Sequence, residues 1–183
     1  MRQSFLFTAL TAALLVSCKP AVQSNIDYMD PFIGTGFHGH TYPGATTPFG
    51  AVQLSPDNYR EVWDASSGYH YDRDSIIGFS HTHLSGTGCV DFGAILFHHT
   101  NHDVALRREG DIYEHLKYSH KDEEASAGYY SVYFKEERLK AELTATPHTG
   151  WHRYTFCKGM PHNIVIDMGH VISVSGEIIK EVE

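Results

Sequence analysis

The chain has 183 residues, a length that fits one domain, and its 22 acidic against 14 basic residues leave a formal net charge of -8. Because proteins bind phosphate backbones with Lys and Arg, an acidic chain without a basic run excludes a nucleic acid as its partner. Its 42% of hydrophobic residues exclude a disordered tail and suffice for a sizeable core. Since the chain also has 14 histidines, which titrate or bind metals near neutral pH, we expect functional residues among them.

Residues 1–17 have the form of a secretory signal peptide. A positive start precedes an apolar stretch over residues 5–16, which is too short to span a bilayer. Ser17 before Cys18 resembles a bacterial lipobox, which predicts cleavage before Cys18 and attachment of a lipid to its sulfur. Residues 18–25 would then be a tether, and the protein an exported lipoprotein of the periplasm or cell surface that touches a membrane only through this lipid. The alternative is an ordinary signal peptide with a chance cysteine.

The chain from residue 26 onward is predicted to be mainly β. Residues 26–54 contain three prolines and five glycines, which exclude a helix there. Short runs rich in β-branched and aromatic residues predict strands at residues 75–80, 92–97, 128–134, 141–146, 150–156 and 163–168. The one helical candidate is short and covers residues 110–117. Because turn clusters separate these runs, residues 26–183 are predicted to form an antiparallel β-sandwich.

The predicted sandwich ends without closing. Residues 178–183 alternate apolar and charged side chains as a strand does, but no turn, cap or polar tail follows them. Such a strand leaves an exposed edge, so we expect the sandwich to be incomplete and its domain truncated. Exposed edges and apolar interfaces favour aggregation, which predicts poor solubility.

Two motifs that suggest familiar chemistry do not have the required context. Residues 34–39 match the spacing G-x-G-x-x-G, but Pro31 precedes them and Pro43 follows, whereas a dinucleotide fingerprint needs a strand before it and a helix after it. Residues 78–82 fall one position short of G-x-S-x-G, and no helix follows to form a nucleophile elbow. The sequence therefore supports neither a dinucleotide site nor a serine hydrolase.

Two H-x-H pairs, His38 with His40 and His81 with His83, place imidazoles on one face of an extended segment. Such pairs can hold zinc, but no local pattern fixes a third ligand, although Cys89 follows the second pair closely. The alternative is that these rings bond to backbone carbonyls in the glycine-rich loops or donate to the hydroxyls of a polar ligand. We favour the polar ligand and assign no metal ligand.

Two further groups of titratable side chains are interpreted as incidental. His98, His99 and His102 follow a predicted strand, which favours an exposed and variable turn. Cys89 and Cys157 could form a disulfide in an oxidising compartment. Because two thiols far apart in sequence are weak evidence for a bridge, separate buried thiols are the favoured interpretation.

Residues 63–71 combine groups that bind sugars. Trp63 lies beside Asp64, two serines and a glycine, followed by Tyr-His-Tyr. An aromatic face covers the C–H face of a pyranose, while carboxylates, hydroxyls and imidazoles bond to its hydroxyl groups. Composition alone leaves equally open the alternative that Trp63 belongs to the core.

Several segments together resemble one known family. They are residues 30–36, 38–45, 48–50, 52–57, 67–71 and 77–89, followed by residues 119–125, 128–130 and 152–156. Over about residues 30–170 the chain closely resembles the N-terminal domain of glycoside hydrolase family 92, the calcium-dependent exo-α-mannosidases. The resemblance implies a β-sandwich that packs against a C-terminal α/α-barrel domain, with an active site between the two domains.

The resemblance also implies inverting hydrolysis of terminal α-mannose in mannose-containing glycans. Inversion needs an acid and a base separated by a water molecule. In this family those carboxylates and most contacts to the calcium cofactor lie in the C-terminal domain, so we assign no catalytic residue to this chain, and Asp57, Asp64 and Asp91 are not promoted to that role. We expect the chain to be inactive by itself.

What the resemblance gives this chain is substrate contact. Trp63 is the expected sugar platform, and the expected lining groups are Ser67, Gly68, His81, His83 and Cys89. The chain departs from the family where Asp64-Ala65-Ser66 stands between Trp63 and Ser67, which leaves the preferred linkage open. The alternative function is a noncatalytic carbohydrate-binding or structural surface lipoprotein.

Overall fold

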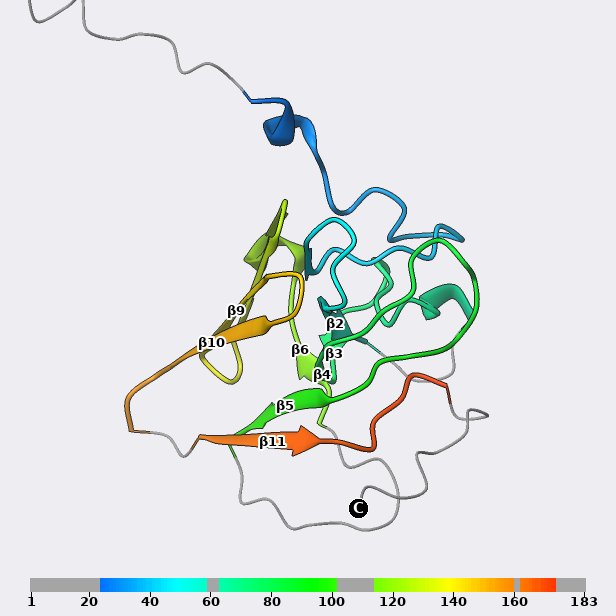
Figure 1. Cartoon of the computed structure of the whole chain (residues 1–183). Coiled ribbons are helices and arrows are strands. Elements are labelled where there is room, and N and C mark those ends of the chain that lie inside the picture. Colours follow the sequence, from blue (N-terminus) through cyan, green and yellow to red (C-terminus); the bar gives the residue numbers. More distant parts are fainter. Residues whose placement is uncertain (1–23, 59–62, 102–113, 160–161, 174–183) are drawn as a thin grey trace, which may run out of the picture.

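The computed structural model describes residues 24–58, 63–101, 114–159 and 162–173, and its regular structure is almost all β (Figure 1). The strands are β1 (Ala45–Thr46), β2 (Gln53–Asp57), β3 (Ser75–Ile76), β4 (Gly78–Ser80), β5 (Leu96–Thr100), β6 (Leu116–Lys117), β7 (Glu123–Ser126), β8 (Tyr129–Phe134), β9 (Leu139–Ala145), β10 (Gly150–Phe156) and β11 (Asn163–Asp167). Short 3-10 helices are η1 (Asn25–Tyr28), η2 (Trp63–Ala65) and η3 (His120–Asp122). No helix in these ranges is long and apolar enough to cross a membrane. The predicted signal peptide, Cys18 and the strand-like C-terminal run lie outside the described residues.

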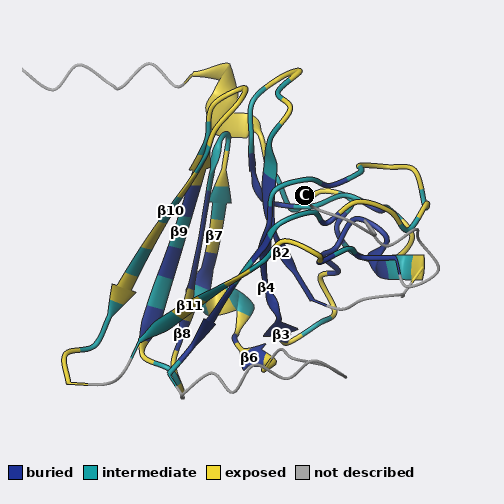
Figure 2. Ribbon diagram, turned by 60° about the horizontal axis from the view of Figure 1, so that its bottom comes forward, coloured by how far each residue is buried: buried dark blue, intermediate teal, exposed yellow. Residues whose placement is uncertain are grey.

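Two main sheets make up the fold, and every strand pairing is antiparallel. One sheet has the order β1-β2-β4-β5-β11, the other has the order β10-β9-β8-β7, and β3 pairs with β6 in a small third sheet. Contacts of β1 and β2 with β9 join the two main sheets. Figure 2 shows β2 and β4 beside the four-stranded sheet. The prediction of a mainly β, antiparallel sandwich is confirmed.

The core lies between the two main sheets. Leu54 and Phe79 enter it from the five-stranded sheet, and Tyr130, Val132 and Leu143 enter it from the four-stranded sheet. All five are buried, and burial of each large apolar side chain stabilises the fold by about 1.5–3 kcal/mol. Because successive strand residues point to opposite faces, β9 leaves Lys140, Glu142 and Thr144 on the outer face of its sheet.

The content of β-branched and aromatic residues located the later strands correctly. The predicted runs 128–134, 141–146, 150–156 and 163–168 correspond to β8, β9, β10 and β11. The register of β8 with β9 pairs Tyr130 with Leu143 and Val132 with Ala141, so the apolar residues of both strands reach the core together. This is the arrangement that half-buried strands require.

The strand predicted at residues 92–97 is wrong over most of its length. Phe92, Gly93 and Ile95 have φ angles of 68°, 81° and 60°, which lie in the left-handed region. An extended strand cannot contain such residues, so β5 begins only at Leu96 and runs on through the histidines.

Three other local features were not predicted. The run 75–80 divides into β3 and β4, because the backbone N–H of Ile77 donates to β2 instead of continuing the strand. Strand β2 contains Pro56, which is tolerated because β1 pairs only as far as Leu54 and leaves that side of β2 without a partner strand at the proline. The prediction of a helix over residues 110–117 is wrong for the residues that the structure describes, because Leu116 and Lys117 form β6.

The histidines of β5 are buried, so the predicted exposed turn is wrong. His98 Nδ1 lies 2.6 Å from the carbonyl oxygen of Ile77, and the ring of His99 packs against Phe156 with centroids 5.0 Å apart. Burial lowers the pKa of both histidines, that of His99 to about 4, so both are neutral at neutral pH. His102 lies outside the described residues.

A buried carboxylate joins the four-stranded sheet to the loop after η2. The hydroxyls of Tyr130 and Tyr69 donate to Glu123 over 2.6 and 3.0 Å, and His120 Nδ1 lies 2.8 Å from the same carboxylate. Burial raises the pKa of both tyrosines, so their hydroxyls remain protonated donors. Glu123 thereby anchors the Tyr69 loop against the core.

Candidate functional site

The loop that begins at η2 exposes Trp63, which is 54% accessible and is therefore not a core residue. The rings of His40 and His38 flank the indole, with centroids 4.4 and 5.1 Å away. A Cβ atom on Gly88 would lie 3.5 Å from Trp63 Cζ2, so the loop before Cys89 borders the same ring. Three loops distant in sequence therefore meet here, and we name His38, His40, Trp63, Asp64 and Gly88 the Trp63 cluster.

Polar pairs hold the rim of the Trp63 cluster. His38 Nδ1 lies 2.6 Å from Asp64 Oδ1, with both side chains about half exposed. On the buried side, His40 Nδ1 lies 2.9 Å from the hydroxyl of Ser66. Phe37 adds a strongly exposed ring beside His38. The cluster therefore combines a fixed aromatic surface with accessible polar atoms, as sugar-binding sites do.

A buried histidine and aspartate lie beneath the Trp63 loop. His83 Nδ1 lies 2.6 Å from the carbonyl oxygen of Gln53, and its Nε2 lies 2.7 Å from Asp57 Oδ1 and 3.1 Å from Ser80 Oγ. Since a carbonyl only accepts, Nδ1 donates to Gln53, and Nε2 faces both Asp57 and Ser80. Serine and aspartate face the same ring nitrogen, so this trio lacks the geometry of a Ser-His-Asp triad.

The other predicted contacts of this loop are also buried. Ser67 donates to the carbonyl oxygen of Thr41 over 2.9 Å. Gly68 has a φ angle of 86°, and a Cβ atom there would overlap Asp57 Oδ1. Ser67, Gly68 and His83 thus lie beneath the loop, where they fix its path, whereas Trp63 lies at its surface.

Both described cysteines are free thiols. Cys157 is half-buried, but Cys89 is exposed, so the prediction of a buried thiol is wrong for Cys89. Gly86 and Gly88 both have positive φ angles, and these turns keep the Cys89 loop at the surface. Cys89 is therefore accessible beside the Trp63 cluster.

His81 belongs to a separate group of rings between the two main sheets. Its Nδ1 lies 3.0 Å from the carbonyl oxygen of Ile95, and its Nε2 lies 3.2 Å from His152 Nε2. Since a carbonyl only accepts, His81 Nδ1 donates to Ile95, and on the far side of this pair His152 Nδ1 lies 3.0 Å from the hydroxyl of Tyr154. Burial, and then the neighbouring His81, lower the pKa of His152 to about 3. The structure therefore separates His81 from the other predicted contacts.

The described ranges contain no group of three or more His, Cys, Asp or Glu side chains placed to hold a metal ion. The members of the H-x-H pairs are engaged otherwise: His38 with Asp64, and both His81 and His83 with backbone carbonyls. For His81 and His83 this is the carbonyl-bonding alternative that the sequence left open. We assign no metal ligand among these residues.

One surface group was missed by the sequence reasoning. Tyr129, Glu142, Trp151 and Arg153 line a pocket on the four-stranded sheet. The available signal was Trp151, a large ring at a position where alternation along β10 calls for an outward-facing residue.

Comparison with known proteins relates the chain to one family. The model of the glycosyl hydrolase family 92 N-terminal domain matches residues 28–182. Among solved structures, the chain is similar to a family GH92 alpha-mannosidase from Bacteroides thetaiotaomicron, solved alone and with mannoimidazole, at 40% identity and a TM-score of 0.74. The match covers 81% of this chain and 20% of the mannosidase chain.

Two further relatives agree with this match. A solved GH92 family glycosyl hydrolase is 28% identical with a TM-score of 0.70, over 81% of this chain and 21% of that one. A protein described as an uncharacterized secreted glycosidase of Arthroderma benhamiae is 28% identical over 166 residues, which cover 84% of this chain and 20% of that protein. The chain thus spans about one fifth of the length of these relatives.

Proposed function

Because the chain belongs to glycosyl hydrolase family 92 by its match to the N-terminal domain, we propose that it forms one side of the substrate cleft of an inverting exo-α-mannosidase. The substrate is a terminal α-linked mannose of a mannose-rich glycan, and the other side of the cleft is a C-terminal α/α-barrel domain. The similar mannosidase that binds mannoimidazole supports mannose as the sugar.

The exposed indole of Trp63 is the observation that carries this proposal. In the proposed complex the ring covers the apolar face of the mannose. The accessible His38–Asp64 pair lies beside the ring and can bond to sugar hydroxyls. The buried His83–Asp57 pair and Gly68 hold the loop that presents the indole, and Cys89 lines the neighbouring loop.

The catalytic acid and base are proposed to come from the C-terminal domain. Asp57 is fully buried against His83, and Asp64 is paired with His38. Because each carboxylate is already bonded to a histidine, we propose neither as the acid or the base. The family is generally calcium-dependent, and we propose that the partner domain holds most of the ligands of the ion, since the described ranges contain no group of three or more His, Cys, Asp or Glu side chains placed to hold a metal.

Export is part of the same proposal. The signal peptide over residues 1–17, the lipid on Cys18 and the tether over residues 18–25 remain predictions, and the secreted relative supports export. Intact-mass analysis of the membrane fraction would detect the lipid as added mass on a chain that begins at Cys18. A chain cleaved elsewhere and without that mass would contradict the lipoprotein.

Mannose release tests the function directly. We expect none from the 183-residue chain alone and calcium-dependent release when the C-terminal domain of a related family 92 mannosidase is added. Trp63→Ala should abolish most of this release, whereas Phe49→Ala, at another exposed ring, should leave it unchanged. Release by the chain alone would refute the assignment of catalysis to the other domain. A folded chain that binds mannosides but never supports release would favour a noncatalytic carbohydrate-binding lipoprotein.

A further inference from the structure

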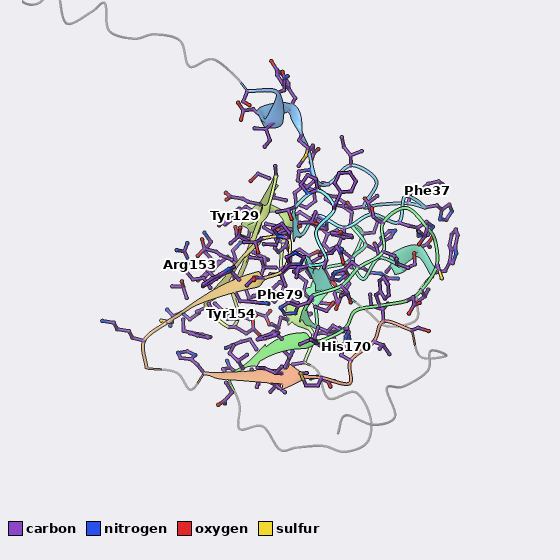
Figure 3. The ribbon with its side chains drawn as sticks, viewed as in Figure 1. Phe37, Phe79, Tyr129, Arg153, Tyr154 and His170 are labelled. Carbon is purple, nitrogen blue, oxygen red and sulfur yellow. The ribbon has the colours of Figure 1, made fainter. Side chains whose placement is uncertain are left out.

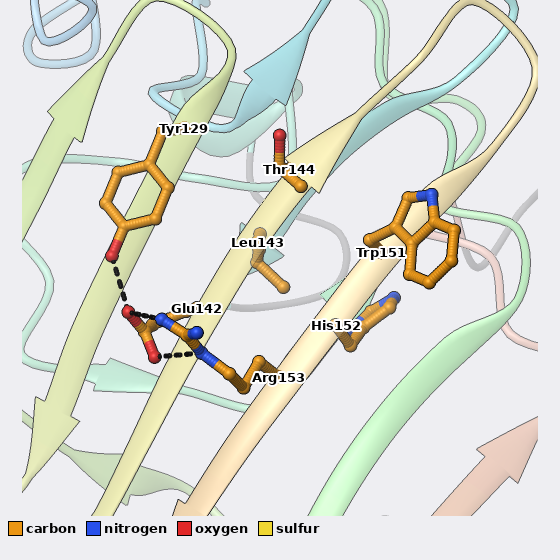
Figure 4. A pocket seen from close by; sticks show the side chains of 7 residues that line it. All are labelled: Tyr129, Glu142, Leu143, Thr144, Trp151, His152 and Arg153. Carbon is orange, nitrogen blue, oxygen red and sulfur yellow. Dashed lines mark hydrogen bonds and ion pairs between the residues drawn. The ribbon is translucent and has the colours of Figure 1, made fainter.

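The outer face of the four-stranded sheet contains a pocket of about 290 Å³ (Figure 4). Tyr129 in β8, Thr144 in β9 and Trp151 in β10 are directly paired across the three strands. In Figure 4 the two rings lie on either side of the small threonine. Since neighbouring strands are about 4.8 Å apart, the two strands that carry the rings are about 10 Å apart, which leaves room for a pyranose unit above the threonine. The pocket therefore has aromatic walls and a low floor.

A fixed ion pair closes one end of this pocket. Arg153 Nε and Nη2 donate to Glu142 over 2.6 and 2.7 Å, and the hydroxyl of Tyr129 donates to the same carboxylate over 2.8 Å. The Arg153 side chain is 73% exposed, so its remaining N–H groups are accessible. Arg153 first, and then Tyr129 and Lys140, lower the pKa of Glu142 to about 2. The carboxylate is thus ionised and oriented before any ligand arrives.

The paired charges of the pocket suit a ligand that carries hydroxyl groups. The bidentate bond to Glu142 balances the charge of Arg153 along one edge of its guanidinium and leaves the other N–H groups as donors. A sugar hydroxyl can both donate to Glu142 and accept from Arg153, and a pyranose can place its C–H face on Trp151. Trp151 is 61% exposed, which leaves this ring free for such contact.

We propose that Tyr129, Glu142, Thr144, Trp151 and Arg153 form a second, noncatalytic site for a neutral saccharide. It is distinct from the Trp63 cluster: Figure 3 places Tyr129 and Arg153 on one side of the molecule and Phe37, the neighbour of His38, at the opposite side. Such a site holds one part of a glycan chain on the protein while the terminal sugar of that glycan lies away from this pocket. The inference does not depend on the proposed mannosidase function.

The chain has two tryptophans, and each lies in one of the two sites. In Trp63→Phe the only indole is Trp151, and in Trp151→Phe it is Trp63. The experiment titrates both variants of the full chain with α-linked mannotriose and records tryptophan fluorescence. We expect a saturable response in Trp63→Phe, weakened roughly tenfold or more by adding Arg153→Gln, which removes the charged donor. The matched control Lys158→Gln, at an exposed position after β10, should leave the response unchanged.

Three results would overturn the second site. The first is that the fluorescence of Trp151 shows no saturable response to mannotriose. The second is that Arg153→Gln leaves that response unchanged. The third is that Trp151 responds only when a C-terminal domain is added. The last result would identify this face as a domain interface. In the Trp151→Phe variant the fluorescence reports on Trp63 alone. Absence of a response in this variant would count against the proposed function and would not affect the second site.

Discussion

Replacing His152 by Gln is expected to make the chain more resistant to acid. His152 is held between the two main sheets, where its ring stacks on Phe97 and bonds to His81 and Tyr154. Burial and the neighbouring imidazole lower its pKa from 6.5 to about 3. The folded chain therefore keeps this ring neutral at pH values where the unfolded chain protonates it.

The size of the effect follows from proton linkage. Because the unfolded state binds the extra proton, stability is lost as the pH falls below 6.5, and the loss ends near pH 3. Well inside this window each pH unit costs about 1.4 kcal/mol, and because the unfolded ring is only half protonated at pH 6.5, acidification from pH 6.5 to pH 4.5 removes about 2.3 kcal/mol through His152. That is a large part of the stability of a small domain, about 5–15 kcal/mol. Gln has no titratable group, so the variant lacks this contribution.

Urea unfolding at several pH values between 7 and 4 measures the effect. The wild-type free energy of unfolding should fall more steeply than that of His152→Gln, while buried His98 and His99 contribute equally to both. His148→Gln, at an exposed position between β9 and β10, is the matched control and should follow the wild type. Parallel curves for the wild type and His152→Gln would refute the argument from the buried ring.

Two further variants test the packing behind the Trp63 loop. Glu123→Gln places an amide where two buried hydroxyls donate to a carboxylate. The free energy of unfolding measured in urea should therefore fall by about 2–3 kcal/mol. The control Glu124→Gln, at an exposed position, should leave it almost unchanged. Gly68→Ala should lower the melting temperature far more than Gly86→Ala, because both have positive φ angles but only the first would overlap Asp57. Equal losses within either pair would contradict the packing argument.

How well the sequence predicted a strand depended on which side chains bury that strand. In β8 and β9 the apolar residues alternate, because one face meets the core and the other meets solvent. Strand β5 lacks that signal, since His98 and His99 are buried through a carbonyl bond and ring stacking instead of through an apolar side chain. Neither partner is visible from local sequence, so propensity placed the strand several residues too early.

The site was predictable as a set of loops but not as a set of surface atoms. The Trp63 segment was identified by the residue types that sugars require, and its indole is exposed. Ser67, Gly68 and His83 were given the same role, yet they lie behind the indole around Asp57. Residue type alone cannot distinguish a polar group that contacts a ligand from one that holds a loop in place, because both need hydrogen-bond partners.

The abundance of histidine is best explained by the many irregular loops of the fold. Carbonyl groups in such loops lack partners from a strand ladder, and a buried carbonyl without a donor is costly. His81, His98 and His170 each direct Nδ1 at such a carbonyl over 2.6–3.0 Å, and His83 does the same at the start of β2. A neutral imidazole supplies this donor together with a flat ring that packs like an aromatic side chain, without bringing a charge into the core. At His98 the same choice adds to the acid sensitivity of the fold, because burial lowers the pKa of that ring and the folded chain keeps it neutral.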